Sequence, residues 1–168
     1  MNDDERFIAN QKLHATVREI RGRILNSLAV IDVNISKILS VYFSPEEHKR
    51  DLLMSEVFTS QSYGLRTKVQ LLKKIISNDL DFYLEDKEWF FSDLEKLRKF
   101  RNDLAHATLD VSEKAHKKAE TQVGFIFYKN GKRHTKVVTF ERADEYRVKA
   151  NMVSDCLNDI ARIYGIRI

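Results

Sequence analysis

Apolar residues along the first quarter of the chain recur at intervals of three and four positions. This spacing keeps one face of a helix apolar and predicts one long helix that ends near Phe43. The stripe consists of Leu13, Val17, Ile20, Ile24, Leu28, Ile31, Ile35, Ile38 and Tyr42, and it is widened by Leu25, Val30, Val33 and Leu39. We therefore expect a second surface of this helix to be covered by another helix or by another subunit.

The residues directly after Phe43 are typical of the start of a second helix. Ser44 is predicted as its N-cap, Pro45 as a residue of its first turn, and Glu47 as the partner that closes a capping box. The stretch from 46 to 58 is helical in character, and residues 59–64 interrupt it with residues that favour caps and bends. A stripe of Leu65, Val69, Leu72 and Ile76 then predicts a further helix that ends at residues 77–79.

A helix from about Asp86 to Ala107 is predicted by acidic residues at its start and basic residues at its end, the order that the helix dipole favours. Its apolar stripe is Phe90, Leu94, Leu97 and Leu104, and Arg101 falls on the same stripe. An arginine cannot lose its charge, and burying it is costly unless acceptors surround it. Beside the stripe, a sector of about 140° predicts a polar groove with a small residue near its middle. Its members are Arg98, Arg101, Asn102, Ala105 and His106.

The hydrophobic period changes to two beyond Asp110. Two alternating runs flank Asn130-Gly131, which predicts a β-hairpin at about 121–140. The helical period returns from Glu141, with Gly165 as the expected C-terminal cap. The sequence therefore predicts a single all-α domain over residues 1–168, with a β-hairpin inserted before the last helix.

The amino-acid composition narrows the possible fold classes and cellular locations. Five glycines and one proline argue against a turn-rich β-sandwich or barrel. Cys156 is the only cysteine, so we expect a small buried side chain in a reducing compartment. The acidic N-terminus has no apolar run, and no window is expected to approach a membrane span. These features predict a soluble, cytoplasmic protein without a membrane partner.

Candidate chemistry is confined to the helix that carries Arg101. The histidines and carboxylates lack metal-ligand spacing, and the chain has neither a glycine-rich phosphate loop nor a nucleophile elbow, so no metal and no cofactor are expected. The net charge of +4 is too small to identify a partner by itself. Residues 111–138 are locally basic, which fits either contact with a nucleic-acid backbone or a solvated hairpin whose lysines protect an edge strand.

The segment Arg101-Asn102-Asp103-Leu104-Ala105-His106 resembles the signature of the HEPN superfamily, in which Arg is followed by four to six residues and then His. The order of helices and the inserted hairpin also resemble this superfamily. The resemblance implies an up-and-down four-helix bundle. It further implies a metal-independent endoribonuclease, active as a homodimer in which the motifs of two subunits face one composite groove.

Carried over by position, the resemblance implies that His106 is the general acid or base at the ribose 2′-hydroxyl or at the leaving oxygen. Arg101 would bind the scissile phosphate, and Asn102 would orient either group. These roles suit the chemistry, because an ordinary histidine titrates near neutral pH and a guanidinium matches phosphate oxygens. The expected partner is RNA, and the expected setting is a toxin or a defence effector.

Two further positions bear on this resemblance. Some HEPN toxins carry a tyrosine two residues after the histidine that antitoxins modify, and Thr108 stands there instead. Such modification is therefore disfavoured, while an antitoxin protein that simply binds stays open. Asp32 is either a polar partner for Arg101 or a residue on the exposed side of the first helix. The alternatives to an enzyme are a non-catalytic HEPN module that binds nucleotides, RNA or protein, and a helical interaction protein in which Arg101 and His106 serve only the helix dipole.

Overall fold

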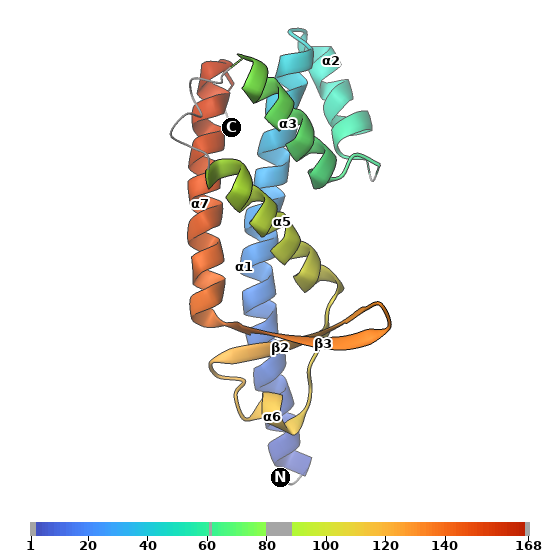
Figure 1. Cartoon of the computed structure of the whole chain (residues 1–168), viewed down its shortest axis with the longest axis vertical. Helices are drawn as coiled ribbons and strands as arrows, with labels where there is room; N and C mark the ends of the chain where they lie inside the picture. Colours follow the sequence, from blue (N-terminus) through green and yellow to red (C-terminus); the bar gives the residue numbers. More distant parts are fainter. Residues whose placement is uncertain (1–2, 61, 80–88, 167–168) are drawn as a thin grey trace. The chain divides into compact units, whose positions relative to one another are not determined.

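The structure is a computed structural model that describes residues 3–60, 62–79 and 89–166. It is mostly helical and divides into two compact units. Unit 1 comprises Met1–Asn26 and Lys99–Val148, and unit 2 comprises Ser27–Arg98 and Lys149–Ile168. The boundaries fall within α1 (Asp3–Phe43), α5 (Trp89–His106) and α7 (Phe140–Ile163), so each of these helices contributes to both units (Figure 1). The single domain stays a prediction, whereas the long first helix is confirmed.

Unit 1 combines the first part of α1 and the last part of α5 with a small antiparallel sheet. The sheet has the order β1-β2-β3, with strands β1 (Thr108–Leu109), β2 (Gln122–Lys129) and β3 (Lys132–Thr139). A short helix, α6 (Glu113–His116), precedes β2. The buried core of this unit consists of Leu13, Val17, Ile20, Ile24, Phe100, Leu104, Ala107, Ala119, Val123, Phe125, Val138 and Ala143.

The predicted hairpin is confirmed, including its turn. Strands β2 and β3 pair from Gln122↔Thr139 to Lys129↔Lys132, which leaves Asn130 and Gly131 as the two turn residues. Both have positive φ values, 51° and 72°, as a type I′ turn requires. Strand β1 was not predicted, because two residues are too short to show a period and the strand exists only through its pairing with β2.

Unit 2 contains the remaining parts of the long helices together with α2 (Glu47–Leu52), a π-helical turn η1 (Leu53–Phe58) and α3 (Leu65–Asp79). Its buried core includes Leu28, Ile31, Ile35, Ile38, Leu39, Phe58, Val69, Leu72, Ile75, Ile76, Phe90, Leu94, Leu97, Val153, Cys156, Leu157 and Ile160. Gly165 ends α7 as expected: its φ is 69°, and Ile166 N–H donates to the Ala161 carbonyl at 2.8 Å. The predicted start of α5 near Asp86 lies outside the described residues.

The predicted capping box at Ser44 is wrong. Helix α2 begins at Glu47, and its N-cap is Glu46, whose side chain makes no capping hydrogen bond. Ser44 belongs instead to the end of α1, because its N–H donates to the carbonyl of Ser40 at 3.0 Å. Pro45 therefore lies in the connection between the two helices, and the second helix starts two residues later than the sequence pattern suggested.

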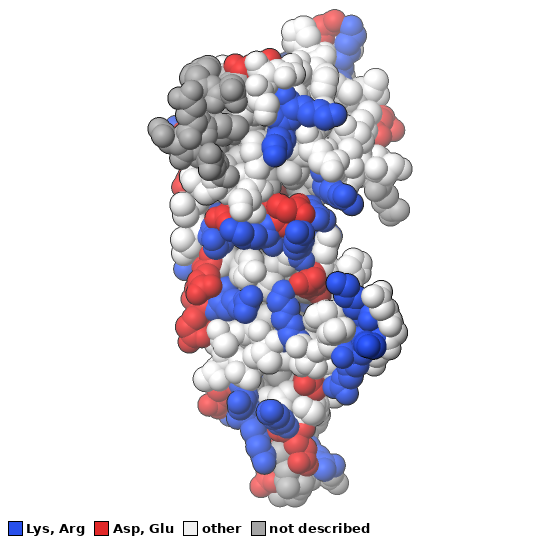
Figure 2. Space-filling model, in the orientation of Figure 1, with Lys and Arg blue, Asp and Glu red and all other residues white. Residues whose placement is uncertain are grey.

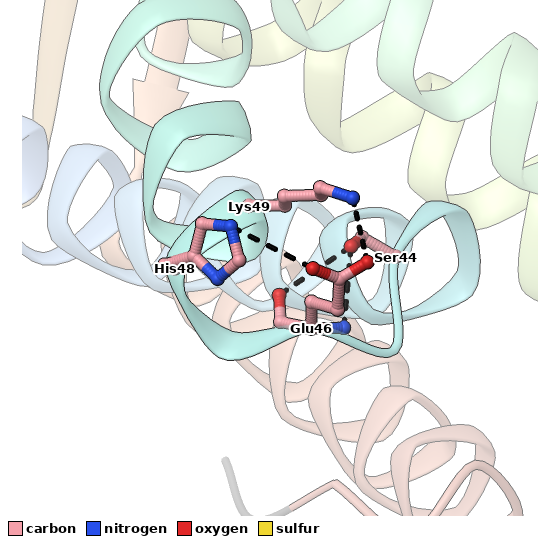
Figure 3. Close-up of polar contacts among 4 residues, drawn as sticks. All are labelled: Ser44, Glu46, His48 and Lys49. Atoms are coloured by element: carbon pink, nitrogen blue, oxygen red, sulfur yellow. Dashed lines mark hydrogen bonds and ion pairs between the residues drawn. The ribbon is translucent and has the colours of Figure 1, made fainter.

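The connection is closed by a local turn around Glu46 (Figure 3). Its backbone N–H donates to Ser44 Oγ at 3.3 Å, and its extended ψ of 125° keeps it outside the helix. The Glu46 carboxylate pairs with Lys49 Nζ at 2.6 Å and lies 3.6 Å from His48 Nε2. These contacts account for His48 and Lys49 as surface residues of the turn rather than as ligands.

Helix α1 passes a length and composition test for a membrane span. Between Ile24 and Val41 it carries only two charged residues, Asp32 and Lys37. The expectation that no window approaches a membrane span is therefore wrong. Half of the apolar window is buried inside the protein, as it is in the core helix of a soluble protein, so the test is weak evidence for a span. The soluble, cytoplasmic location stays a prediction.

Candidate functional site

The three predicted site residues lie together at the end of α5, within unit 1. Arg101 and His106 are exposed, and Asn102 is half-buried. Arg101 Nη1 donates to Asn102 Oδ1 at 3.2 Å, which orients the guanidinium along the helix surface. Within the described part of the chain, His106 has no hydrogen-bond partner. Its imidazole is therefore accessible to a ligand from solvent.

Arg101 does not lie on the buried stripe of α5, so this prediction is wrong. Phe100 occupies the stripe between Leu97 and Leu104, with 1% of its surface exposed. Its ring stacks on Tyr146 of α7 at a centroid distance of 3.7 Å, which fixes the rotation of this part of the helix. Intervals of three and four allow either 100 or 101 after Leu97, and the phenylalanine takes the buried position because its burial is favourable.

The polar sector is consequently an open face of the helix in a single chain. Ala105, the predicted floor, is exposed together with Arg101 and His106. A phosphate can reach Arg101 and His106 from solvent, because both side chains are exposed. A groove around them would need a second surface, such as a second copy of the chain.

The end of α5 is stabilised by an arginine that the sequence pattern did not reveal. Arg21 of α1 donates from Nη2 to the carbonyl of Ala107 at 2.6 Å, and its guanidinium lies over the Phe125 ring at 4.9 Å. Burial lowers the pKa of Arg21 from its ordinary value. Arg21 therefore supplies a cationic donor at the end of α5, in addition to Arg101 and His106.

The hairpin is attached to the same turn of α5. Lys136 Nζ of β3 pairs with Asp103 Oδ2 at 2.6 Å, and it lies 5.0 Å from the centre of the Phe100 ring. Strand β1 follows α5 directly and places Thr108 opposite Ile126 of β2. A lysine, a ring contact and a strand pairing therefore hold the hairpin against the segment that carries the candidate site. Figure 2 shows Lys and Arg side chains gathered over this hairpin.

Arg98, which the sequence placed in the same polar sector, is already engaged within unit 2. Its Nε and Nη2 each donate to the carboxylate of Glu95 at 2.7 Å. The hydrogen bond to Glu95 raises the pKa of Arg98, although burial acts in the opposite direction. Arg98 therefore has a carboxylate partner, whereas Arg101 has none among the described residues.

Asp32 has a partner that the sequence did not predict. Lys68 Nζ lies 2.6 Å from Asp32 Oδ1, and the lysine side chain is only 5% exposed while that of the aspartate is 38% exposed. The ammonium group of Lys68 is thus the buried member of the pair. The Asp32 carboxylate compensates this buried charge, which explains its place on α1 without a ligand.

The remaining candidates carry no chemistry of their own. Cys156 is buried, as predicted. His116, expected at the surface, is half-buried, and its Nε2 lies 2.7 Å from Asn10 Oδ1. Thr108 is exposed on β1. Among the described residues, no three His, Cys, Asp or Glu side chains gather closely enough to hold a metal ion.

Comparison of the chain with protein-family models, with curated proteins and with solved structures found no match. The site must therefore be interpreted from its own residues.

Proposed function

We propose that this protein is a metal-independent endoribonuclease of HEPN type. The observation that carries the proposal is that Arg101 and His106 are exposed on one segment of α5, where the half-buried Asn102 accepts a hydrogen bond from Arg101. In this proposal α1, α3, α5 and α7 correspond to the four helices of the HEPN bundle. The hairpin of β2 and β3 is the insertion before the last helix.

The proposed reaction uses the ribose 2′-hydroxyl as the nucleophile. Its oxygen bonds to the adjacent phosphorus while the bond from phosphorus to the 5′-oxygen breaks. A neutral His106 accepts the 2′-hydroxyl proton, and a protonated His106 of a second subunit donates a proton to the leaving 5′-oxygen. Arg101 balances the charge that develops on the phosphate oxygens. The products are a 2′,3′-cyclic phosphate and a 5′-hydroxyl, and no metal takes part in any step.

A homodimer is part of the proposal, because one chain presents His106 on an open face. Unit 2 offers an apolar surface for a partner: Val30 and Val33 of α1 are each 47% exposed. We expect sedimentation measurements to give twice the chain mass at micromolar concentration. Val33→Asp should shift the protein toward the monomer, because a charge in an apolar interface is costly.

The proposal is tested with single-stranded RNA in buffer containing EDTA. We expect the wild-type protein to cleave the RNA, and we expect His106→Ala and Arg101→Ala each to reduce cleavage by at least 100-fold, the scale of a lost acid, base or phosphate contact. His48→Ala is the matched control, since His48 is an exposed histidine in unit 2 and should keep wild-type activity. Cleavage that is absent, or that survives both site substitutions, would refute the assignment.

A non-catalytic RNA-binding module is the second candidate. The observation that favours it is that His106 has no partner in one chain and lies on an open surface, as a simple binding residue would. This candidate predicts RNA binding that weakens steeply with salt and that is not accompanied by cleavage in EDTA. A regulatory setting as a toxin or defence effector belongs to the first candidate, because uncontrolled RNA cleavage would harm the cell.

A further inference from the structure

One face of the hairpin continues from the candidate site toward the turn. Side chains alternate along each strand, so Phe127 and Lys129 of β2 share a face with Lys132, His134 and Lys136 of β3. Lys136 contacts Asp103 of α5, which shows that this is the face turned toward the helix. We call Phe127, Lys129, Lys132 and His134 the distal face, because they lie between Lys136 and the turn.

The distal face carries positive charge that the protein does not neutralise. The strands and their turn contain no Asp or Glu between Thr121 and Thr139. Lys129 and Lys132 lie opposite each other at the end of the ladder, both exposed. In the described part of the chain neither has an ion-pair partner, in contrast to Lys136.

The distal face also carries a stacked pair of rings. Phe127 and His134 are direct cross-strand neighbours, with ring centroids 5.7 Å apart and planes inclined by 14°. Phe127 is half-buried, whereas His134 is exposed, so the outer side of the imidazole is open to solvent. Stacking of a nucleobase on such a ring is tolerant of base identity and needs an unpaired base.

The protection of a sheet edge explains only part of this arrangement. Lysines on the edge strand β3 would discourage pairing with another chain. Strand β1 pairs with β2 only at Ile126 and Phe125, so edge protection accounts for Lys129 of β2 as well. That role does not require a stacked ring pair on the same face, or attachment of this face to the segment that holds Arg101 and His106. Unpaired cations beside an open ring are the combination that single-stranded nucleic acid requires.

We propose that the distal face is the arm that binds the single-stranded RNA substrate next to the catalytic segment. Lys129 and Lys132 contact backbone phosphates, and His134, supported by Phe127, stacks on an unpaired base. The inference rests on the proposed function, because it names the substrate conformation and the surface that binds it. Tyr128, which is 72% exposed, lies on the opposite face and takes no part.

The test measures binding of a fluorescein-labelled single-stranded RNA by fluorescence polarisation at several salt concentrations. The full chain carries His106→Ala throughout, so that the RNA stays intact. We expect Lys129→Gln with Lys132→Gln to reduce the slope of log affinity against log salt by about 1.4, the value for two lost phosphate contacts on a single strand. The matched control is Lys117→Gln with Lys118→Gln, which removes the same charge from the exposed turn after α6 and should leave the slope unchanged.

The stacking contact is tested by comparing one ring variant from each face of the hairpin. We expect His134→Ser to weaken binding of single-stranded RNA about tenfold and to leave binding of a duplex of the same sequence unchanged. Tyr128→Ser, an exposed ring on the other face, should change neither. Circular dichroism and the urea midpoint of each variant confirm that the hairpin is folded.

The outcomes separate this inference from the proposed function. The distal face is not the RNA arm if the substitutions at Lys129 and Lys132 change the slope as much as those at Lys117 and Lys118. It is also not the RNA arm if His134→Ser and Tyr128→Ser have the same effect on binding. Both conclusions hold whether or not the wild-type protein cleaves RNA. If the distal-face variants lose affinity as expected but the wild-type protein does not cleave in EDTA, the arm is supported and the catalytic proposal fails. An absence of RNA binding, or displacement of RNA by an acidic peptide at equal charge concentration, would overturn the arm.

Discussion

Asp93 provides a stability prediction that can be worked out from unit 2 alone. Its side chain is 10% exposed, and its carboxylate is held by two lysines, Lys96 Nζ at 2.8 Å and Lys149 Nζ at 3.1 Å. Burial by itself would raise the pKa of Asp93, but the hydrogen bonds and charges of Lys96 and Lys149 outweigh burial and hold its pKa below the ordinary value. The folded state therefore favours the charged carboxylate.

Asp93→Asn removes the charge and keeps the shape. The amide retains one oxygen acceptor for one lysine, while its NH₂ group faces the other ammonium. One charge-assisted hydrogen bond in a buried position contributes about 1.5–3 kcal/mol. Both lysine side chains are more than a third exposed and can be hydrated again, so we expect the lower part of this range, a loss of about 1.5–2 kcal/mol in the free energy of unfolding.

The pH dependence follows from the direction of the shift. A carboxyl group whose pKa is lower in the folded state stabilises the protein above its unfolded pKa, about 3.9 for Asp, and this contribution disappears as the pH falls through the folded pKa. The difference between wild type and Asp93→Asn should therefore be complete at pH 7, shrink below about pH 4 and vanish at still lower pH.

The assay is urea unfolding followed by circular dichroism from pH 7 down to pH 3. The matched control is Asp144→Asn, because Asp144 forms a pair of the same spacing with Arg147 at 3.1 Å, but both side chains are about half exposed. It should cost less than about 0.5 kcal/mol. If the two variants lose equal stability, or if the Asp93 difference is as large at pH 3 as at pH 7, the reasoning is refuted.

Three further predictions concern stability, each measured by urea unfolding. Gly22→Ala should stabilise the protein by about 0.5–1 kcal/mol, because Gly22 lies within α1 with no atom near an added Cβ. Gly131→Ala should destabilise it by about 1 kcal/mol because its φ is 72°; a loss of stability in the first variant, or a gain in the second, would contradict the corresponding prediction. Lys68→Met should cost less than about 1 kcal/mol, and Asp32→Ala should cost about 3 kcal/mol by leaving a buried ammonium unpaired; the reverse order would show that the aspartate is the costly charge. Arg21→Met should cost about 1–2 kcal/mol through the lost hydrogen bond to the end of α5, and an unchanged midpoint would show that solvent replaces it.

Local signals predicted the parts of the fold that depend on a few neighbouring residues. Asn130-Gly131 predicted the hairpin and its turn, because few other residue pairs adopt positive φ at both positions. Gly165 predicted the end of α7 for a similar reason. The start of α2 failed because Ser44 can accept a hydrogen bond from a turn as well as from a helix, and its own N–H is already used by α1.

Contacts between distant residues were beyond the sequence pattern. Strand β1 exists only through pairing with residues about 17 positions away, Leu109 with Phe125 among them. Arg21 reaches the end of α5 across 86 positions, and Lys149 reaches Asp93 across 56. Patterns of apolar residues treat charged residues as exposed, so they cannot show which charged residues are buried in pairs. For Arg101, the period of 3.6 left two neighbouring positions equivalent, and packing of Phe100 decided between them.

The candidate site was predicted as a set of residues rather than as a geometry. Arg101, Asn102 and His106 lie on one segment of α5, but Arg101 and His106 are exposed on an open face of one chain instead of lying in the predicted groove. The groove, the dimer and the RNA substrate stay predictions that the experiments above address.

The most direct measurement is mass spectrometry of the RNA ends after incubation with the protein in EDTA. The account predicts fragments that end in a 2′,3′-cyclic phosphate, paired with fragments that begin with a 5′-hydroxyl. These fragments should be produced by the wild-type protein and be absent with His106→Ala. Fragments with 5′-phosphate ends, cleavage of an all-2′-deoxy strand, or equal product from His106→Ala would contradict the account.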